Sequence, residues 1–193
     1  MFAQLDTKSV YSFMDSVVDL NSYVARAKEL GYQALGLMDR DNLYAAYHFA
    51  QLASRNGLRP LIGMEANLFY EGRKIPFRLL AKNNQGYKNL MKLATELSSG
   101  QRELTAFSDY LNAIALILPS EDWESGMTLG SEVFIGVRPE DAGKEFDYPV
   151  VPLHTVRYFE NSDRSTIQML HAISQNVSLS EASICPMNQL LFS

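Results

Sequence analysis

The hydrophobic positions along this chain follow two spacings: short unbroken runs, and stripes that recur every three or four residues. Unbroken apolar runs are typical of strands covered on both faces, whereas the stripes are typical of helices with one buried face. The runs predict strands at residues 3–7, 33–38, 60–64, 113–118, 133–137 and 150–153. The stripes predict helices at residues 21–30, 42–56, 85–97 and 163–174. Because strands alternate with helices, we expect an α/β fold with a parallel sheet and right-handed crossovers.

One segment departs from this alternation. Residues 68–70 and 75–81 are extended pieces on either side of a turn at Glu71 and Gly72, and they predict a hairpin-like excursion from the sheet. Asn21 is the predicted cap of the first helix. The tail from residue 176 onward has no clear period.

The composition is that of an ordinary globular protein. The chain has 193 residues, 47% hydrophobic and 20% charged, which suits a single domain over residues 1–193. No segment is apolar for long enough to span a bilayer, and the first residues lack the features of a signal peptide. A lone cysteine, Cys185, excludes an internal disulfide. We therefore expect a cytoplasmic protein without a membrane partner, and the lack of a terminating signal suggests a piece of a longer chain.

Charge is unevenly distributed along the chain. The net charge of −5 argues against a broad basic field that grips nucleic acid, so any such contact must be local. Residues 72–95 carry no acidic side chain, whereas residues 103–147 are mostly acidic. The basic side chains of the first segment are Arg73, Lys74, Arg78, Lys82, Lys88 and Lys92. Two interpretations stay open: two solvated faces of opposite sign, or a basic edge that contacts a phosphate backbone or an acidic partner.

Candidate chemistry lies directly after the strand predicted at residues 33–38. Asp39, Arg40 and Asp41 form a polar turn there, and the carboxyl ends of strands are where α/β folds bind ligands and metals. The other candidates at predicted strand ends are Asp6, Glu65 and His154. Such carboxylates could bind a hard ion such as magnesium, but a multinuclear zinc or manganese site needs more ligands.

The remaining chemistry-bearing residues are less informative. His48 and His171 fall inside predicted helices, where a structural role is favoured. Cys185 has no histidine near it in sequence that could activate it. The chain contains no nucleophile elbow, phosphate-binding loop or dinucleotide fingerprint.

Four segments resemble the start of bacterial DNA polymerase III alpha subunits, of the type found in low-GC Gram-positive bacteria. They are residues 2–15, 37–43, 61–65 and 79–93, in the order and at the spacing of that family. This start is the PHP (polymerase and histidinol phosphatase) domain, and the resemblance implies a distorted seven-stranded βα barrel similar to a TIM barrel. It also implies a parent chain that is a DNA-directed DNA polymerase, a nucleotidyltransferase of DNA replication, with its palm aspartates beyond this segment.

The resemblance also implies where metal ligands would lie. Active members carry a His-x-His pair on the first strand, an Asp-His pair after the second, a glutamate after the third, a histidine in the excursion and a late Asp-x-His pair. These positions fall on or near Asp6, Lys8, Asp39, Arg40, Glu65, Pro76, Thr155 and Arg157. Asp39 and Glu65 keep the family's residue types. Asp6 is a substitute carboxylate, and His154 lies one position before the late pair.

Fixed cations at Lys8, Arg40 and Arg157 stand where active members bind metal ions. Because an arginine stays protonated at any working pH, we expect these cations to form a salt-bridge network with the carboxylates of the vestigial site. Those carboxylates are Asp6, Asp39 and Glu65. Our first hypothesis is therefore a degenerate domain, without catalytic residues or a metal cluster, that acts as a structural and docking module. The alternative is a metal-dependent 3′ to 5′ exonuclease that proofreads, and a third hypothesis is a stand-alone phosphatase.

Cofactors and partners follow from the same resemblance. It implies no cofactor in this domain, and magnesium at the polymerase site of the parent chain. The implied partners are the remaining domains of the polymerase, replisome subunits such as the sliding clamp, and DNA, contacted mainly through the parent chain. If the domain holds any metal ion, the candidate ligands are Asp6, Asp39, Glu65 and His154.

Overall fold

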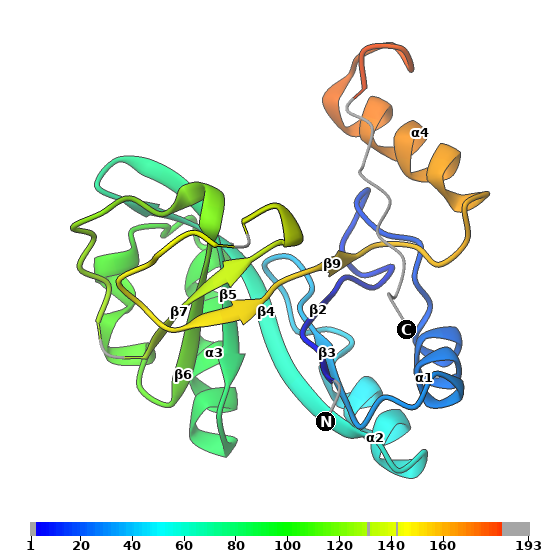
Figure 1. The fold of residues 1–193 in the computed structure, drawn as a ribbon, viewed down its shortest axis with the longest axis horizontal. Coiled ribbons are helices and arrows are strands. Elements are labelled where there is room, and N and C mark those ends of the chain that lie inside the picture. The colour runs from blue at the N-terminus through cyan, green and yellow to red at the C-terminus, as the bar shows by residue number, and fades with distance from the viewer. Residues whose placement is uncertain (1–2, 131, 142, 183–193) are drawn as a thin grey trace. The chain divides into compact units, whose positions relative to one another are not determined.

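The structure is a computed structural model that describes residues 3–130, 132–141 and 143–182 (Figure 1). The chain divides into two compact units. The first unit contains residues 1–40, 44–61 and 154–193, and the second contains residues 41–43 and 62–153. Each unit has its own strands and helices and is described separately.

Among the described residues, the first unit contains short strands and three helices. The strands are β1 (Ala3–Gln4), β2 (Asp6–Thr7), β3 (Ala34–Leu37) and β9 (Thr155–Val156). The helices are α1 (Leu20–Glu29), α2 (Ala46–Arg55) and α4 (Asp163–Gln175). Strand β1 pairs in parallel with β3, and β2 pairs in parallel with β9. The first unit is therefore built around two parallel pairs.

The strand predicted at residues 3–7 is split in two at Leu5. A Cβ atom on Gly36 of β3 would lie 1.9 Å from the Leu5 carbonyl oxygen, so only glycine allows the chain to cross here. Tyr23 of α1 fixes the crossing, because its hydroxyl accepts a hydrogen bond from Thr7 Oγ1 (2.9 Å) and donates one to the Gly36 carbonyl (3.0 Å). Burial raises the pKa of Tyr23 far above its usual value, so the hydroxyl stays protonated.

Two helix starts differ from the prediction. Helix α1 is capped by Asp19 rather than Asn21, and the Asp19 carboxylate accepts bonds from the backbone N–H groups of Asn21 (2.9 Å) and Ser22 (3.3 Å). A hydrogen bond from the Ser22 side chain, followed by these backbone bonds, holds the pKa of Asp19 below its usual value. Helix α2 begins four residues later than expected. Asp41 has a φ of +55°, which is not a helical conformation. Leu43, whose apolar side chain suggested an earlier helix start, packs against the core of the second unit instead of belonging to α2.

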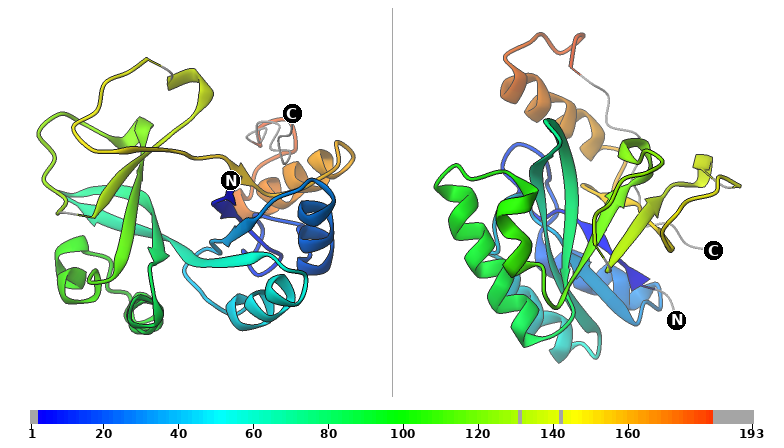
Figure 2. Two further views of the ribbon diagram at one scale, coloured as in Figure 1. Left: turned by 60° about the horizontal axis from the view of Figure 1, so that its bottom comes forward. Right: turned by 90° about the vertical axis from the view of Figure 1, so that its left-hand side faces the viewer.

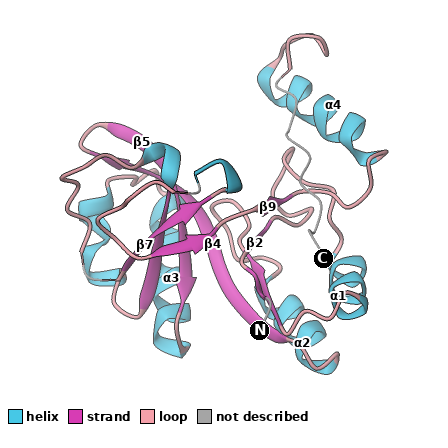
Figure 3. Ribbon diagram, viewed as in Figure 1, coloured by secondary structure: helices cyan, strands magenta, loops and turns pink. Residues whose placement is uncertain are grey.

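The second unit is a mixed sheet. Its strands are β4 (Arg59–Tyr70), which begins in the first unit, β5 (Arg73–Ala81), β6 (Ile114–Pro119), β7 (Val133–Val137) and β8 (Val150–Pro152). Strand β5 is antiparallel to both β4 and β6, whereas β6, β7 and β8 are parallel (Figure 3). The predicted hairpin is therefore confirmed, and it consists of two long strands that lie within the main sheet, so the sheet is mixed rather than parallel throughout. Glu71 and Gly72 form the turn, as predicted. Both have positive φ angles, which the common two-residue hairpin turn requires.

Helix α3 (Asn84–Ser98) and the 3-10 helix η1 (Leu104–Tyr110) cover one face of this sheet (Figure 2). Asn83 caps α3 through its side-chain oxygen, which accepts bonds from the backbone N–H groups of Gln85 and Gly86. Helix α3 buries Leu90, Leu93 and Leu97, and these side chains join the apolar cluster contributed by the strands. The start and end of α3 differ from the prediction by one residue each.

Across the chain, seven strands follow the order β1-β3-β4-β5-β6-β7-β8 in the main sheet. The α/β class is confirmed, and the number of strands agrees with that of the family's barrel. Within the described residues, no helix is long and apolar enough to cross a membrane.

Candidate functional site

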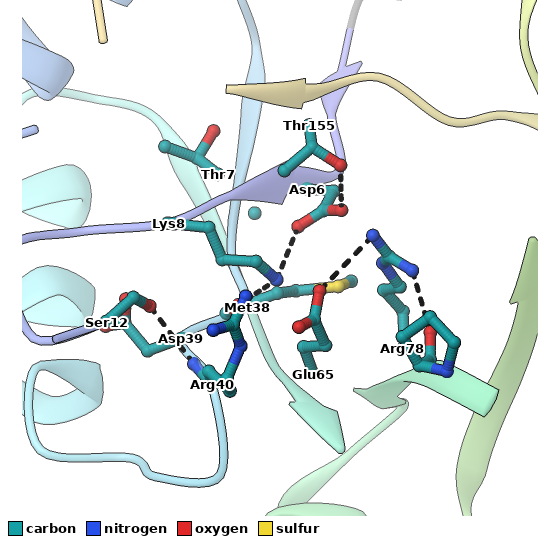
Figure 4. Close-up of polar contacts among 12 residues, drawn as sticks. Asp6, Thr7, Lys8, Ser12, Met38, Asp39, Arg40, Glu65, Arg78 and Thr155 are labelled. Carbon is teal, nitrogen blue, oxygen red and sulfur yellow. Dashed lines mark hydrogen bonds and ion pairs between the residues drawn. The ribbon is translucent and has the colours of Figure 1, made fainter. Parts of the chain in front are cut away.

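Asp6 and Lys8 form a buried ion pair at the end of β2 (Figure 4). The Lys8 Nζ atom lies 3.1 Å from Asp6 Oδ1 and donates to the Met38 carbonyl oxygen at 2.7 Å. Neither side chain is exposed to solvent. The pairing of β2 with β9 sets Thr155 opposite Asp6, and its hydroxyl donates to Asp6 Oδ2 at 2.7 Å. Asp6 is thus bound by an ammonium group and a hydroxyl from its own unit.

Asp39 is bound by serine groups. Its carboxylate accepts hydrogen bonds from the backbone N–H and the hydroxyl of Ser9 and from the hydroxyl of Ser12, each at 2.7 Å. The Ser12 hydroxyl in turn accepts from the Arg40 backbone N–H at 3.1 Å (Figure 4). In the part of the chain that the structure describes, Asp39 has no ion-pair partner. Its charge is stabilised by directed hydrogen bonds rather than by the neighbouring guanidinium.

The two arginines at family ligand positions converge on Asp15, which the sequence analysis did not identify. Arg40 Nη2 lies 2.7 Å from Asp15 Oδ2, and Arg157 Nε lies 3.0 Å from Asp15 Oδ1. His171 of α4 contacts the same carboxylate through Nε2 at 3.3 Å. Asp15 is buried, at 4% exposure. A structural role for His171 was predicted from its place in a helix, but nothing in the sequence pattern indicated its partner.

In the second unit, Glu65 of β4 is paired with Arg78 of β5. The two residues lie opposite each other in the antiparallel register, and Arg78 Nη2 lies 3.2 Å from Glu65 Oε2. Arg78 Nη1 also donates to the Pro76 carbonyl oxygen at 2.7 Å (Figure 4). Both side chains are buried. Arg78, grouped by sequence with the basic edge, is therefore an internal partner of the glutamate at a family ligand position.

The remaining residues of the basic segment lie on the surface. Arg73 pairs with Glu124 and lies near Asp122, and Lys82 pairs with Glu132 at 2.6 Å. The Lys92 ammonium lies 6.0 Å from the centre of the Tyr110 ring. The side chains in this segment that are exposed are Arg73, Lys74, Lys82, Lys88 and Lys92. Acidic residues from the segment 103–147 thus neutralise part of the basic segment.

The other sequence candidates have separate surroundings. Asp41 belongs to the second unit, where Arg102 Nη1 donates to its carboxylate at 2.8 Å. The His154 carbonyl oxygen accepts a bond from Gln4 Nε2 at 2.6 Å. His48 is exposed on α2, and Cys185 lies outside the described residues. Among the residues that the structure describes, no group of three or more His, Cys, Asp or Glu side chains is arranged to hold a metal ion.

Comparison with known proteins identifies the family. The model of the PHP domain matches residues 4–127. The chain is 45% identical over 193 residues to DNA polymerase III subunit alpha of Streptococcus pyogenes serotype M1, an alignment that covers 99% of this chain and 19% of that protein. It is 33% identical over 126 residues to DNA polymerase III subunit alpha of Bacillus subtilis (strain 168), covering 62% of this chain and 11% of that protein. An amidohydrolase structure from Chromobacterium violaceum aligns with a TM-score of 0.46 and 11% identity, over 64% of this chain and 69% of that chain.

This chain belongs to the PHP domain family. It is similar over almost its whole length to alpha subunits of DNA polymerase III. It spans about a fifth of the length of these curated relatives.

Proposed function

We propose that this chain is the PHP domain of a DNA polymerase III alpha subunit and that it serves DNA replication as part of that parent chain. The identity of 45% across 99% of the chain supports this proposal. The parent chain extends primers from deoxynucleoside triphosphates at a magnesium-dependent site that lies outside this segment. Its partners are the other polymerase domains, the sliding clamp and DNA, in the cytoplasm.

Within this segment we infer that the vestigial site binds no catalytic metal cluster and hydrolyses no phosphoester. The carrying observation is the buried Lys8 ammonium, 3.1 Å from Asp6 and at a position where active relatives carry a histidine ligand. A cation fixed there repels a metal ion electrostatically and already uses the carboxylate that such an ion would need.

The other carboxylates at ligand positions support the same inference. Asp39 accepts three bonds from Ser9 and Ser12, and Glu65 is paired with Arg78. Metal ligands must offer free lone pairs in a converging geometry, and each of these carboxylates is already bound by donors of the protein. The donor set does not fit a metal cluster. The residues instead fit a structural role, in which internal hydrogen bonds and ion pairs hold the strand ends.

The inference is tested with the full-length parent polymerase and a primer whose 3′ end is mismatched, in the presence of manganese. We expect no 3′ to 5′ digestion, either by the unsubstituted protein or by the variant Asp39→Asn. Elemental analysis should find no tightly held metal that depends on Asp6 or Glu65. Digestion that disappears in Glu65→Ala would instead establish the proofreading exonuclease.

A second role of the segment is docking, for which the basic segment is one candidate surface. Lys74 and Lys88 are exposed there, while Lys82 and Arg73 pair with acidic side chains. We propose that Lys74, Lys88 and Lys92 contact an acidic surface or a phosphate backbone. Replacing all three with glutamine should weaken DNA binding by the parent chain and reduce its salt dependence, measured by fluorescence anisotropy. Unchanged affinity and salt dependence would exclude the contact with a phosphate backbone.

A further inference from the structure

The loop formed by residues 9–17, which follows β2, presents apolar side chains to solvent. Phe13 is 81% exposed, and Val10 and Tyr11 are each 50% exposed. Exposed apolar side chains are common singly, but three within four positions of one loop form a local patch. This patch lies entirely within the first unit.

The loop is held in one conformation at several points. Ser9 and Ser12 donate to the buried Asp39 carboxylate, and Asp15 is bound by Arg40 and Arg157. These three partners, Asp39, Arg40 and Arg157, are residues at the family's ligand positions. The residues at the family's ligand positions therefore hold loop 9–17 in place, and we call this set of contacts the clamp.

Backbone contacts add to the clamp. The Val10 N–H donates to the Val18 carbonyl at 3.0 Å, and the Val17 N–H donates to the Arg157 carbonyl at 3.1 Å. Met14 has a φ of +60°, a conformation that is costly for a residue with a side chain and that persists where the surroundings over-determine it. A surface loop fixed in this way loses little conformational entropy when it binds a partner.

The chemistry of the patch selects the kind of partner. Asp15 is the one charged residue between positions 9 and 17, and its carboxylate is buried. A phosphate backbone is recognised by cations, which the loop itself does not offer. Apolar and aromatic side chains without charge are typical of the centre of a permanent protein interface.

From these observations we infer that loop 9–17 is a docking surface for the remainder of the parent polymerase chain, with Phe13 as the anchoring side chain. The inference rests on the proposed function. The relatives are about five times as long as this segment, since the segment covers 19% of their length, so most of the parent chain lies outside it. Because the two surfaces would belong to one chain, they meet at a high effective concentration, and an uncharged patch needs no charged groups to steer the encounter.

The first test is site-specific photo-crosslinking in the full-length polymerase. A benzoylphenylalanine replaces Phe13, and a matched protein carries it in place of Tyr47, which is 70% exposed on α2. After irradiation, mass spectrometry should find crosslinks from position 13 to residues of the same chain beyond this segment, at higher yield than from position 47. Crosslinks from position 13 to DNA, to a second copy or to another protein would overturn the inference, as would equal yields at the two positions.

The second test measures docking strength. In full-length Phe13→Ser, limited proteolysis should release the segment at least about tenfold faster than in the parent protein, as expected when an anchoring side chain leaves an interface. Tyr47→Ser, at an exposed position of α2, should leave the rate unchanged. Because Phe13 is exposed within its own unit, its loss does not disturb the domain's core. Rates within about twofold of the parent protein would overturn the inference.

Primer extension by the same preparations separates the two proposals. A parent chain that extends primers but fails both docking tests retains the proposed function and loses this inference. A parent chain that extends no primer fails the proposed function itself.

Discussion

The two units use charged residues in different ways. In the first unit, the Lys8–Asp6 pair has no solvent exposure, and Asp15 binds both Arg40 and Arg157 while buried. Removing charges from water is costly, so such groups are stable only with their partners in place. The fold of the first unit therefore depends on these pairs, because removing one partner leaves a buried charge without its counter-charge.

The second unit carries most of its pairs on the surface. The side chains of Lys82 and Glu132 are each 46% exposed, and those of Arg138 and Glu121 are similar. Water and salt screen such pairs, and their net contribution to stability is small. Ion pairs of the same residue types therefore contribute different amounts to stability, depending on how deeply they are buried. Single substitutions can measure that difference.

The largest effect is expected for Lys8→Ala. It leaves the buried Asp6 carboxylate without its ammonium partner and should lower the free energy of unfolding by about 3–5 kcal/mol. Denaturant unfolding followed by circular dichroism gives this value. The double variant Lys8→Met with Asp6→Leu should recover much of the loss, because no buried charge remains. A loss below about 1 kcal/mol for Lys8→Ala would remove the contrast between the units.

The next effect is expected for Asp15→Asn, which keeps the shape of the side chain and removes its charge. Arg40 and Arg157 then lose their shared acceptor charge, and we expect a loss of about 2–3 kcal/mol in the same unfolding assay. The matched control is Asp19→Asn, because asparagine caps a helix about as well as aspartate, and its effect should stay within about 0.5 kcal/mol. Equal effects at the two positions would contradict a special role for the Asp15 cluster.

Asp141 of the second unit tests whether a partly screened carboxylate contributes an amount of stability between that of the buried pairs and that of the surface pairs. Hydrogen bonds from Lys144 and Ser120 lower its pKa from 3.8 to about 2. A folded-state pKa below the unfolded value gives stability that is fully present above about pH 4 and is lost as the pH falls towards 2. Because Lys144 is mostly exposed, screening reduces the contribution to about 1 kcal/mol. Asp141→Asn should flatten unfolding-versus-pH curves in that window, and an unchanged slope would contradict the assignment.

The smallest effect is expected for Lys82→Met, an exposed position between β5 and α3. The pair with Glu132 is half exposed, so its loss should cost less than about 0.5 kcal/mol. The same denaturant titration at low and high salt provides the check. A loss above about 2 kcal/mol would show that surface pairs of the second unit are as important as the buried pairs of the first.

Local sequence signals were sufficient for several elements. The helix at 85–97 and the strands at 113–118 and 133–137 were predicted to within about one residue, because each has a strong apolar period and clear end signals. The first half of β4 was predicted as a strand at residues 60–64, but its second half and β5 were assigned to an excursion, because the pattern loosens after Glu65, where pairing with neighbouring strands defines them. Strand 3–7 was predicted whole because a single glycine on β3, Gly36, decides where it breaks.

By itself, the sequence determined the order of strands and helices, the α/β class and the substitution of cations at Lys8, Arg40 and Arg157. The tertiary structure decided which carboxylate each cation binds. Asp15 and Arg157 are separated by 142 positions in the chain, and Asp39 is bound by serines 27 and 30 positions away. Spacing along a chain indicates which side chains share a strand end, but ion pairs and hydrogen bonds depend on distances of a few ångströms between remote segments. Those distances exist only once the chain has folded, and they gave Arg40 the partner Asp15, which lies outside the expected set of Asp6, Asp39 and Glu65.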